Sequence, residues 1–505
     1  MMKSFSLLFA VFLAVESGLP VEGWATEIPD VQEILVQSSL IASLTQKNQD
    51  RDSLLGRIVT AQVAIQDLKG ALRTIDFIGG DKDTALSRVV KAQTALGDLD
   101  GAKNTANVMR SEINKANVLA DIAIEEAKAG KMERALKTLS TIKNDTHGYR
   151  QALKGIGTIQ AQTGKIEEAL KTVSEVMDSQ PNALWDIVIP KTEAGDVEDA
   201  KQIISNVSNP FHKAYALWGV VRGKINVGDL AGAIQIADSI EAGHAKASAL
   251  VEIAYFQLKT GKVEDALQSL HTAAKAAEHV VNVWAKADIL MQIAEAQAKA
   301  GDVESALKTA GSIEAEGHRE FALKKIVVTQ AESGDKDGAL QTAFTFEGKD
   351  GGALTNISEK EALSGNIQDA MTTIARIKGE SERSIAMIKV IKVQAESGDI
   401  KGALRSAGKI HDGIYKDWAL QDIAEAQSRS GDIQGALKTI AMIQGEYPKG
   451  EALITIAKLQ IIKGDSKGAY AFANLREDPV EKSYALLGIA LGMSELESKK
   501  VNPTK

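Results

Sequence analysis

Five side chains suited to anchoring a ligand lie within one stretch of the chain. The sequence numbers of Trp185 and Trp218 differ by 33. Tyr215 and Arg222 flank the second tryptophan, and the step from Arg222 to Tyr255 is again 33. Aromatic rings and guanidinium groups are frequent binding hot spots, because they bury a large area with few rotatable bonds. We therefore expect a ligand-binding patch here; the alternative is that the rings fill a wide gap in the hydrophobic core.

Four histidines take nearly the same place in their repeats, in the loop that enters the first helix, and raise the question of a metal site. They are His147, His212, His244 and His318. A zinc site needs its ligand atoms within about 2 Å of one ion, whereas neighbouring helical repeats lie about 10 Å apart. Only His212 and His244 belong to neighbouring repeats, so we expect solvent-exposed loop histidines and no metal.

Most motifs of the common enzyme classes are absent from the sequence. There is no G-x-x-x-x-G-K-[ST], G-x-G-x-x-G or H-E-x-x-H that would hold a phosphate or zinc. G-x-S-x-G occurs once, from Gly464 to Gly468, but its Gly-Asp pair recurs along the chain without the serine, so it does not indicate a nucleophile. We predict a protein that is not an enzyme and has no cofactor. A hydrolase that uses groove carboxylates has only the abundance of Asp and Glu in its favour.

A recurring glycine indicates that nearly the whole chain is one repeat. The step from one mark to the next is most often 33 and ranges from 31 to 34, except for a step of 40 between Gly261 and Gly301. Gln66 takes the matching place at the front. The glycine marks are Gly97, Gly130, Gly164, Gly195, Gly228, Gly261, Gly301, Gly334, Gly365, Gly398, Gly431 and Gly464.

Each repeat reads as two antiparallel helices. Apolar residues stand eleven, eight and seven residues before the mark, as at Leu420 and Ile423, and form one face of a helix. The glycine ends that helix in the left-handed conformation, and the following Asp, such as Asp432, caps the next helix. Ala436 and Leu437 then begin the apolar face of the second helix. Stacked hairpins bury a continuous core, and with 44% hydrophobic residues, 4% aromatics and 8 prolines we predict an all-α solenoid of about thirteen repeats.

This spacing resembles the tetratricopeptide repeat over roughly residues 51 to 497. The resemblance rests on a small residue in each helix, here Ala424 and Ala436, around the Gly431-Asp432 turn. It departs from the family where Leu replaces an early aromatic, Gln replaces a tyrosine, and the closing proline survives only at Pro181 and Pro448. The resemblance implies a right-handed superhelix with a concave groove, and it places the aromatic patch on that concave face.

Two polar or flexible positions recur without an evident reason in packing. Nine of the thirteen repeats have Gln four residues before the mark, as at Gln427, where it would hydrogen-bond between successive repeats or read a ligand's backbone. The resemblance places this position in the seam within one repeat, so we favour the structural role. Seven repeats have Gly just before the second helix's Ala, as at Gly435, at a cost of up to about 1 kcal/mol relative to Ala. Close approach of helices would explain that glycine.

The ends of the chain differ from the repeats. Residues 1–25 combine Lys3, an apolar run and small residues before Thr26, which predicts a cleaved signal peptide rather than a membrane anchor. We assign residues 26–50 to an N-terminal capping helix, 51–280 to repeats 1–7, 281–480 to repeats 8–13, 481–497 to a C-terminal capping helix and 498–505 to a tail. The seven extra residues after Gly261 would lengthen a second helix.

Charge and export narrow the choice of partner. The formal net charge is −8 and no run of five like charges occurs, so a nucleic-acid partner is not expected. We predict a periplasmic or secreted, non-catalytic scaffold that binds a protein or an extended peptide in its concave groove. The alternatives are a carbohydrate or cell-wall binding module that stacks sugar rings on the groove tryptophans, and a purely structural spacer.

Overall fold

The computed structural model describes residues 29–45, 49–241, 243–344 and 351–501, which form 28 helices and no strand. The predicted signal peptide lies outside these described residues. Thirteen helix pairs follow one another in the predicted order, so the all-α solenoid of two-helix repeats is confirmed.

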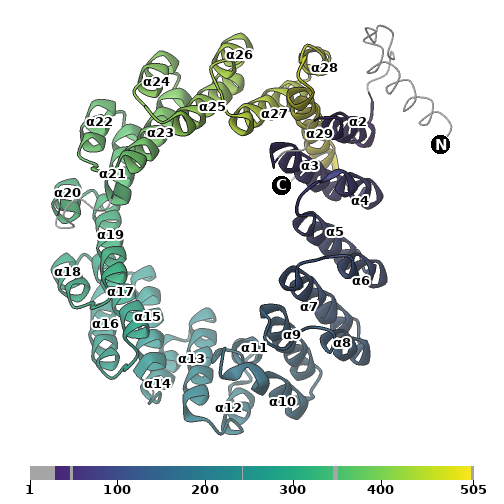
Figure 1. Cartoon of the computed structure of the whole chain (residues 1–505). Helices are drawn as coiled ribbons and strands as arrows, with labels where there is room; N and C mark the ends of the chain where they lie inside the picture. The colour runs from purple at the N-terminus through teal and green to yellow at the C-terminus, as the bar shows by residue number, and fades with distance from the viewer. Residues whose placement is uncertain (1–28, 46–48, 242, 345–350, 502–505) are drawn as a thin grey trace.

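The first helix of each pair, helix A, lines the inside of the array (Figure 1). These helices are α3 (Gln49–Ala64), α5 (Asp83–Ala95), α7 (Glu112–Lys128), α9 (His147–Gln162), α11 (Trp185–Glu193), α13 (Pro210–Asn226), α15 (Gly243–Lys259), α17 (Val283–Lys299), α19 (Glu316–Glu332), α21 (Gly351–Leu363), α23 (Glu380–Glu396), α25 (Gly413–Ser430) and α27 (Glu446–Ile462).

The second helix, helix B, lies on the outside and is usually shorter. These helices are α4 (Leu68–Phe77), α6 (Leu99–Asn107), α8 (Met132–Leu139), α10 (Ile166–Met177), α12 (Val197–Ser205), α14 (Leu230–Asp238), α16 (Val263–Glu278), α18 (Val303–Gly311), α20 (Lys336–Phe344), α22 (Ile367–Ala375), α24 (Ile400–Ala407), α26 (Ile433–Ile440) and α28 (Ser466–Asn474). The seven-residue insertion falls in α16, whose 16 residues make it the longest of them.

The turn between the two helices forms as the sequence predicts. All twelve glycine marks have φ between 75° and 93°, and Gln66 has φ 61°. This left-handed region suits glycine, which has no Cβ. After the mark, Asp432 Oδ1 accepts a hydrogen bond from the backbone N of Gly435 at 2.8 Å, and Asp399 accepts the same bond from Gly402.

The same contact explains the recurring glycine before the helix B alanine. A Cβ built on Gly435 or Gly402 would collide with the carboxylate of the capping aspartate. In the repeat where Lys131 replaces that aspartate, the cap bond is missing and the corresponding residue is Arg134. The glycine therefore gives room to the capping carboxylate, although it is not required for the cap, because Ser305 at the same place donates its backbone N–H to Asp302 at 3.0 Å.

The recurring glutamine joins the two helices of one hairpin. Gln427 Oε1 accepts a hydrogen bond from Thr439 Oγ1 at 2.7 Å. The predicted bond between successive repeats is wrong, because the side chain points into the seam with its own helix B. The same bond occurs in the pairs Gln160–Thr172, Gln257–Ser269, Gln297–Thr309, Gln330–Thr342 and Gln394–Ser406.

The array curves until its two ends meet, which makes a closed ring (Figure 1). The first described helix, α2 (Val31–Ser43), packs on the last, α29 (Pro479–Val501). Ser38 Oγ donates to the backbone O of Ser483 at 2.9 Å, and Ser483 Oγ donates back to the O of Ser38 at 3.2 Å. Arg57 on α3 also pairs with Glu451 on α27. The two terminal helices were expected to cap opposite ends of an open array; instead each covers the other.

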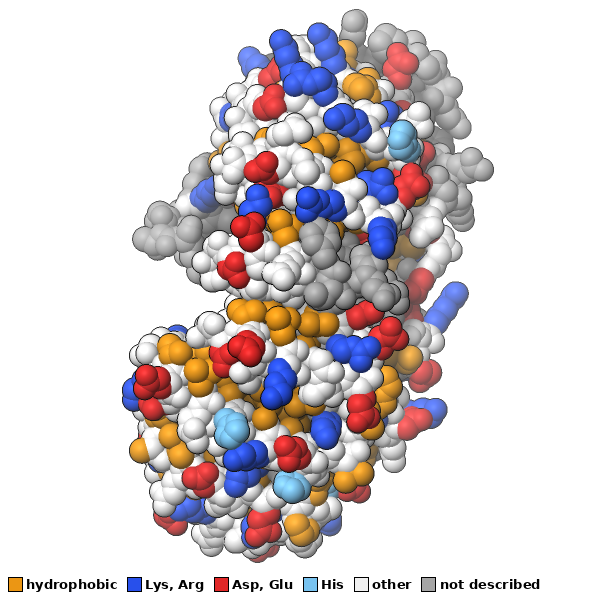
Figure 2. All heavy atoms as spheres, turned by 90° about the vertical axis from the view of Figure 1, so that its left-hand side faces the viewer, with side chains coloured by type: hydrophobic (Ala, Val, Ile, Leu, Met, Phe, Trp, Pro, Cys, Tyr) orange, Lys and Arg blue, Asp and Glu red, His pale blue; other side chains and the backbone are white. Residues whose placement is uncertain are grey.

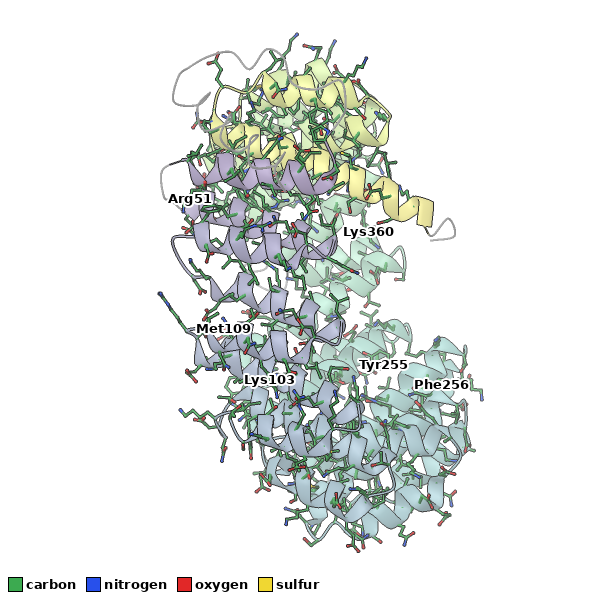
Figure 3. The ribbon with its side chains drawn as sticks, turned by 90° about the vertical axis from the view of Figure 1, so that its right-hand side faces the viewer. Arg51, Lys103, Met109, Tyr255, Phe256 and Lys360 are labelled. Atoms are coloured by element: carbon green, nitrogen blue, oxygen red, sulfur yellow. The ribbon has the colours of Figure 1, made fainter. Side chains whose placement is uncertain are left out.

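The hydrophobic core lies between the inner and outer helices and continues across this junction. One cluster of buried apolar residues holds residues 31–220 and 327–490, and a second holds residues 214–326. The second cluster separates the two parts of the first along the chain, so those parts are joined where the chain ends meet. In the side view of Figure 3, Arg51 lies near this junction and Tyr255 lies on the wall across the ring. No described helix is long and apolar enough to span a bilayer.

Candidate binding site on the inner face

One side of every helix A faces the inside of the ring. The apolar stripe of helix A packs against helix B, so the opposite side points inward, at places seventeen, thirteen, ten and six residues before the mark. Val220 and Val221, on the packed side of α13, are fully buried. The inward places of α13 are incompletely buried and hold Phe211, Tyr215, Trp218 and Arg222.

Three of the predicted residues form an aromatic cluster, which we define as Trp185, Tyr215 and Trp218. The ring centroids of Trp185 and Trp218 are 4.7 Å apart in an edge-on arrangement, and those of Tyr215 and Trp218 are 5.7 Å apart. Trp185 Nε1 donates to the backbone O of Tyr215 at 2.7 Å. A Cβ on Gly219 would come within 2.9 Å of the Trp185 ring, so this glycine allows α11 and α13 to approach. The cluster therefore bridges two successive repeats.

Arg222 is held over the aromatic cluster. Its guanidinium carbon lies 4.4 Å from the Trp185 ring centroid and 6.0 Å from that of Trp218. On its other side the guanidinium forms a two-pronged ion pair with Glu252 of α15, in which Nε donates to Oε2 at 3.1 Å. The cation is thus fixed between an indole face and a carboxylate, although its side chain is still 39% exposed.

Tyr255 is the predicted residue that does not join the cluster. It lies on α15, and its hydroxyl donates to the backbone O of Gln292 on α17 at 3.4 Å. Lys299 Nζ lies 5.1 Å from its ring centroid. Burial raises the pKa of Tyr255, so the hydroxyl stays protonated and acts as a donor. The predicted patch therefore consists of the cluster with Arg222, and a separate tyrosine one repeat further on.

Two neighbours of the cluster were missed by the sequence analysis. The ring centroids of Phe211 and Tyr215 are 4.8 Å apart. His244 stacks on Tyr215, with ring centroids 5.5 Å apart and ring planes at 13°. His244 Nδ1 is also 2.8 Å from the Tyr215 hydroxyl. Burial lowers the pKa of His244, against an opposing effect of Asp288, so the neutral ring is favoured. The sequence numbers of Phe211 and His244 differ by the repeat period of 33, and this shared place in the repeat was the available signal.

The prediction of solvent-exposed histidines is wrong for most of the four. His212 is buried, with Nε2 3.3 Å from Asp178, and His318 Nε2 lies 3.2 Å from Asp288. His244 is half-buried as described above, which leaves only His147 exposed. These three histidines lie in the first turn of helix A, where each ring contacts a residue of the preceding repeat. Within the described ranges no group of three or more potential ligands is suitably placed for a metal ion.

A hollow of about 550 Å³ lies between α9 and the start of α11, next to the cluster. Its lining includes Gln151, Lys154, Gln180, Asn182 and Asp186, with Lys154 Nζ 3.3 Å from Asp186. It exists because α11 starts only at residue 185 and has 9 residues, whereas α9 and α13 have 16 and 17. A proline at position 181 disfavours helical backbone at the residue before it, so the first turns of this helix A are replaced by a loop.

Charged residues on the inner face are paired between successive repeats. The residue six before the mark pairs with the residue nine before the next mark. In some pairs the basic residue belongs to the earlier repeat, and in others the acidic residue does. Such pairs are Arg222–Glu252, Glu295–Lys325, Glu359–Lys389 and Lys392–Asp422. The inner face therefore carries both signs side by side and has no stripe of free positive charge along these pairs.

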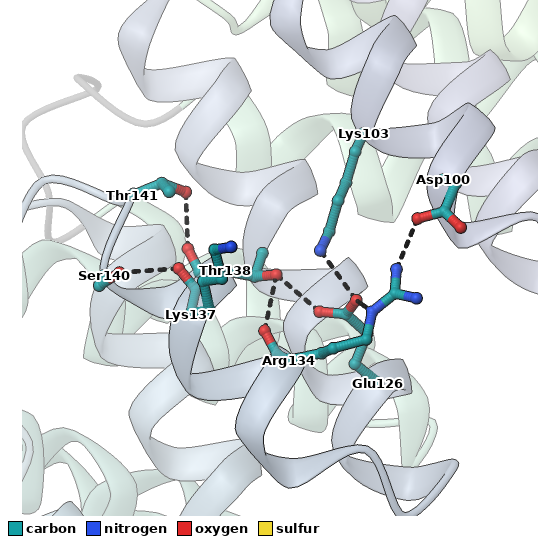
Figure 4. A network of polar contacts seen from close by, with 8 residues as sticks. All are labelled: Asp100, Lys103, Glu126, Arg134, Lys137, Thr138, Ser140 and Thr141. Carbon is teal, nitrogen blue, oxygen red and sulfur yellow. Dashed lines mark hydrogen bonds and ion pairs between the residues drawn. The ribbon is translucent and has the colours of Figure 1, made fainter.

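A buried ionic network lies away from the cluster, in the α7–α8 hairpin (Figure 4). Glu126 occupies the place that glutamine takes in most repeats and is fully buried. Its carboxylate accepts hydrogen bonds from Lys103 at 2.8 Å, Arg134 at 3.0 Å and Thr138 at 2.6 Å. Every bond stays within the hairpin and its neighbour, so this network has a structural role.

Comparisons with known proteins give only a coarse placement. No family model matches the sequence, and no curated protein matches it. Among solved structures, the chain is similar to Ton1535 from Thermococcus onnurineus NA1, with 16% identity, a TM-score of 0.22, and coverage of 79% of this chain and 97% of that one. It is also similar to the pentatricopeptide repeat protein PPR10 from maize, with 12% identity, a TM-score of 0.36, and coverage of 95% and 74%.

A third similar structure is Naa15/Naa10 bound to HypK-THB, with 12% identity, a TM-score of 0.28, and coverage of 91% and 82%. These identities and scores are too low to carry a function. The chain's own helix pairs make it a helical-repeat protein.

Proposed function

We propose that this chain is an exported, non-catalytic scaffold of the tetratricopeptide type that binds an extended peptide on the inner face of its ring. The observation that carries the proposal is the half-exposed cluster of Trp185, Tyr215 and Trp218 under Arg222, on the side of helix A that faces inward. Aromatic and arginine side chains of this kind anchor protein partners. The amides of the adjoining hollow supply donors and acceptors for a peptide backbone.

The ring contacts favour a peptide over a carbohydrate. A sugar ring needs an open aromatic face on which to stack. Arg222 covers one face of Trp185, the Trp218 ring meets Trp185 edge-on, and His244 lies flat on Tyr215. A peptide side chain or backbone can instead use the exposed edges of these rings and the paired guanidinium.

The charge arrangement disfavours a nucleic-acid partner. A phosphate backbone is bound by basic side chains that release its counterions. On the inner face, Arg222, Lys325 and Lys389 are each paired with a carboxylate of the neighbouring repeat. Over the outer helices α16 to α22, Figure 2 shows basic and acidic side chains interspersed. A phosphate contact at any of these three side chains would have to break an existing ion pair.

Export is proposed from the N-terminal sequence alone. Its early lysine, apolar run and small residues before Thr26 are typical of a cleaved signal peptide. The mature protein would then begin at residue 26 and act in the periplasm or outside the cell. A pulse-labelling experiment that detects a precursor and a shorter mature form, with cleavage after Ala25 read by N-terminal sequencing, tests this step.

A binding screen with defined probes tests the proposed function. Protein spanning residues 26–505 is applied to an array of random 15-residue peptides, to a glycan array and to fluorescent single-stranded RNA. We expect selective peptide binding that falls about tenfold in Trp218→Leu, and falls also in Arg222→Gln, which keeps every ring. Leu475→Ser, a change of an exposed residue beyond α28, serves as the matched control.

Circular dichroism must first show that each variant keeps its helicity. Binding to glycans or RNA without binding to peptides would overturn the proposal. Peptide binding that is unchanged in both inner-face variants would leave a peptide binder but would remove the cluster as its site.

A further inference from the structure

An exposed apolar band continues from the aromatic cluster around half of the inner face. Its side chains occupy the places seventeen or thirteen residues before the mark, on the first turns of the helices A from α13 to α27, and they are 42–65% exposed. Within the described residues, two of these helices add no apolar side chain to it: the corresponding places are His244 and the buried Ser248 on α15, and Gly352 on α21. We define the apolar band as Phe211, Trp284, Phe321, Ile385, Ile414, Trp418 and Tyr447.

The band is concentrated in one half of the ring. In the first repeats the same places mostly hold polar side chains, such as Ser53 on α3 and Gln151 on α9, and Ile113 on α7 is the exception. At its start the band contacts the cluster, since the Phe211 and Tyr215 rings are 4.8 Å apart. Contiguous exposed apolar surface is unusual on a soluble protein and marks an interaction site. The band therefore extends the cluster along a curved path.

The spacing of the band limits the conformation of what binds to it. Helices packed side by side lie about 8–10 Å apart, so anchors on neighbouring helices A are roughly 8–10 Å apart, and anchors on either side of α15 or α21 are roughly twice as far apart. A polyproline II segment has three residues per turn and rises about 3.1 Å per residue, so it returns to the same face about every 9 Å. A β-strand returns to the same face about every 7 Å and falls out of step within a few anchors.

Curvature excludes the other regular conformation. An α-helix presents a face every seven residues, or about 10.5 Å, which would match the spacing. However, thirteen helices at the packing distance form a ring whose inner radius is about 20 Å, and α-helices bend with a radius of about 60–100 Å. A helix would touch two or three anchors and then leave the wall, whereas a polyproline II segment has no internal hydrogen bonds to break as it bends.

The aromatic character of the band agrees with this conformation. Five of its seven members are aromatic, namely Phe211, Trp284, Phe321, Trp418 and Tyr447. Aromatic-lined surfaces are the usual docking sites of proline-rich segments, because the bound conformation is already populated in the free peptide. The Trp418 ring stays in place through an edge-on contact with Tyr415 at 5.5 Å.

We propose that the apolar band docks a polyproline II segment of the partner, with an apolar side chain at every third residue and anchors on six of the eight helices A from α13 to α27. This inference rests on the proposed peptide-binding function and specifies the peptide. The polar positions of the partner would face the centre of the ring. The polar half of the inner face, from α3 to α9, would not take part.

Three synthetic 18-residue peptides of related composition test the proposal. The first peptide carries leucine at every third position, with proline and glutamine at the positions between. The second has the same composition, but its leucines are gathered in one half of the peptide at every second position. The third keeps leucine at every third position and replaces each proline with glycine. Dissociation constants are measured for the protein spanning residues 26–505 by fluorescence anisotropy of labelled peptide. We expect the first peptide to bind about tenfold tighter than either of the others.

Exposed band residues can be changed with little risk to the fold, so variants sharpen the test. Phe321→Ser combined with Trp418→Ser should weaken the first peptide about tenfold or more, while Leu475→Ser, which is also exposed but lies outside the band, should not. Equal affinity for all three peptides, no binding of any of them, or an unchanged affinity in the band variant would overturn the inference. The peptide array of the preceding section then tells whether peptide binding itself fails or only its period of three.

Discussion

Gln66 occupies a left-handed backbone position that glycine occupies at the other twelve marks. A side chain with a Cβ is strained in this region by about 1–2 kcal/mol. Gln66 is exposed, so its side chain offers no packing in return. We predict that Gln66→Gly raises the free energy of unfolding by about 1 kcal/mol, measured as a higher midpoint in urea.

The reverse change provides the control. Gly97→Gln places glutamine at the next mark, where φ is 79°, and should lower the unfolding midpoint by a similar amount. A Gln66→Gly protein that is no more stable than the parent would mean that the strain at this position is relieved in solution.

Glu126 gives the stability a dependence on pH. Burial, the largest effect, acts to raise its pKa, but hydrogen bonds from Lys103, Thr138 and Arg134 together with the charge of Lys103 outweigh it, and the pKa lies below the ordinary value. A carboxyl with a lowered pKa stabilises the fold above its unfolded pKa of about 4.3, and this contribution is lost as the pH falls through the folded value.

We therefore predict that Glu126→Gln lowers the free energy of unfolding by about 1–2 kcal/mol at pH 7, and that the difference from the parent shrinks below about pH 4. Glutamine keeps the bond to Thr138 seen in other repeats and loses only the ionic part. Thermal unfolding across pH 3 to 7 measures this, with the exposed Glu133→Gln as a control that should show no effect. A pH-independent difference would assign the loss to packing.

At the scale of the helices, the hairpin is held together by its turn and by one buried side-chain bond. Gln427 reaches across from helix A to Thr439 of helix B, and five other repeats have the same bond. Both side chains are buried, at 4% and 2% exposure. The bond therefore fixes how the two helices sit against each other.

Removing the hydroxyl should leave a buried amide oxygen without its partner. We predict that Thr439→Val, which preserves the shape, lowers the free energy of unfolding by about 1–3 kcal/mol, and that amide hydrogen exchange in α25 and α26 rises. Thr272→Val is the matched control, because Thr272 is partly exposed and donates to the backbone of its own helix. Equal losses of unfolding free energy in the two variants would show that the buried bond contributes no more to stability than the partly exposed one.

The sequence predicts these elements well because their causes are local. Glycine marks, capping aspartates and apolar stripes each act within a few residues, and all three were read from a period of 33. The partner of Gln427 was not predicted, because the same spacing allows a bond within a hairpin or between hairpins. The close contact between Gly435 and the Asp432 carboxylate could not be predicted either, because it depends on atomic distances that a residue pattern does not contain.

The candidate site was predicted in part for the same reason. Trp185, Tyr215, Trp218 and Arg222 share places in successive repeats, so their contact follows from the period. Tyr255 shares the place of Arg222 but is one helix too far away to reach the cluster. The hollow depends on the late start of α11, which leaves this helix A about two turns shorter at its N-terminal end.

At the scale of the molecule, closure of the ring was not predictable from the repeat. The curvature of the array is the sum of small rotations between thirteen hairpins. This total rotation cannot be read from the residue type at any single position of the repeat. The meeting of α2 with α29 closes the wall around the inner face, so a partner reaches that face through the open centre of the ring or by opening this junction. Reciprocal bonds between Ser38 and Ser483, 445 positions apart, mark the junction.

The absence of cysteine allows a direct test of closure. We predict that Ser38→Cys combined with Ser483→Cys forms an intramolecular disulfide on mild oxidation, because each hydroxyl already lies within 3.2 Å of the other residue's carbonyl oxygen. A monomer that migrates faster on a non-reducing gel and has no free thiol would show the bond. Each single variant is the control, and two persistent thiols in the double variant would mean that the ends stay apart.

The central claim is that a peptide binds inside the ring, and photo-crosslinking measures this most directly. A benzophenone amino acid replaces Phe211 on the inner face in one variant and Leu136 on the outer helix α8 in another; both residues are exposed, at 45% and 43%. With labelled peptides that bind on the array, we predict strong crosslinking from position 211 and background levels from position 136. Equal yields from the two positions, or a higher yield from position 136, would contradict the claim.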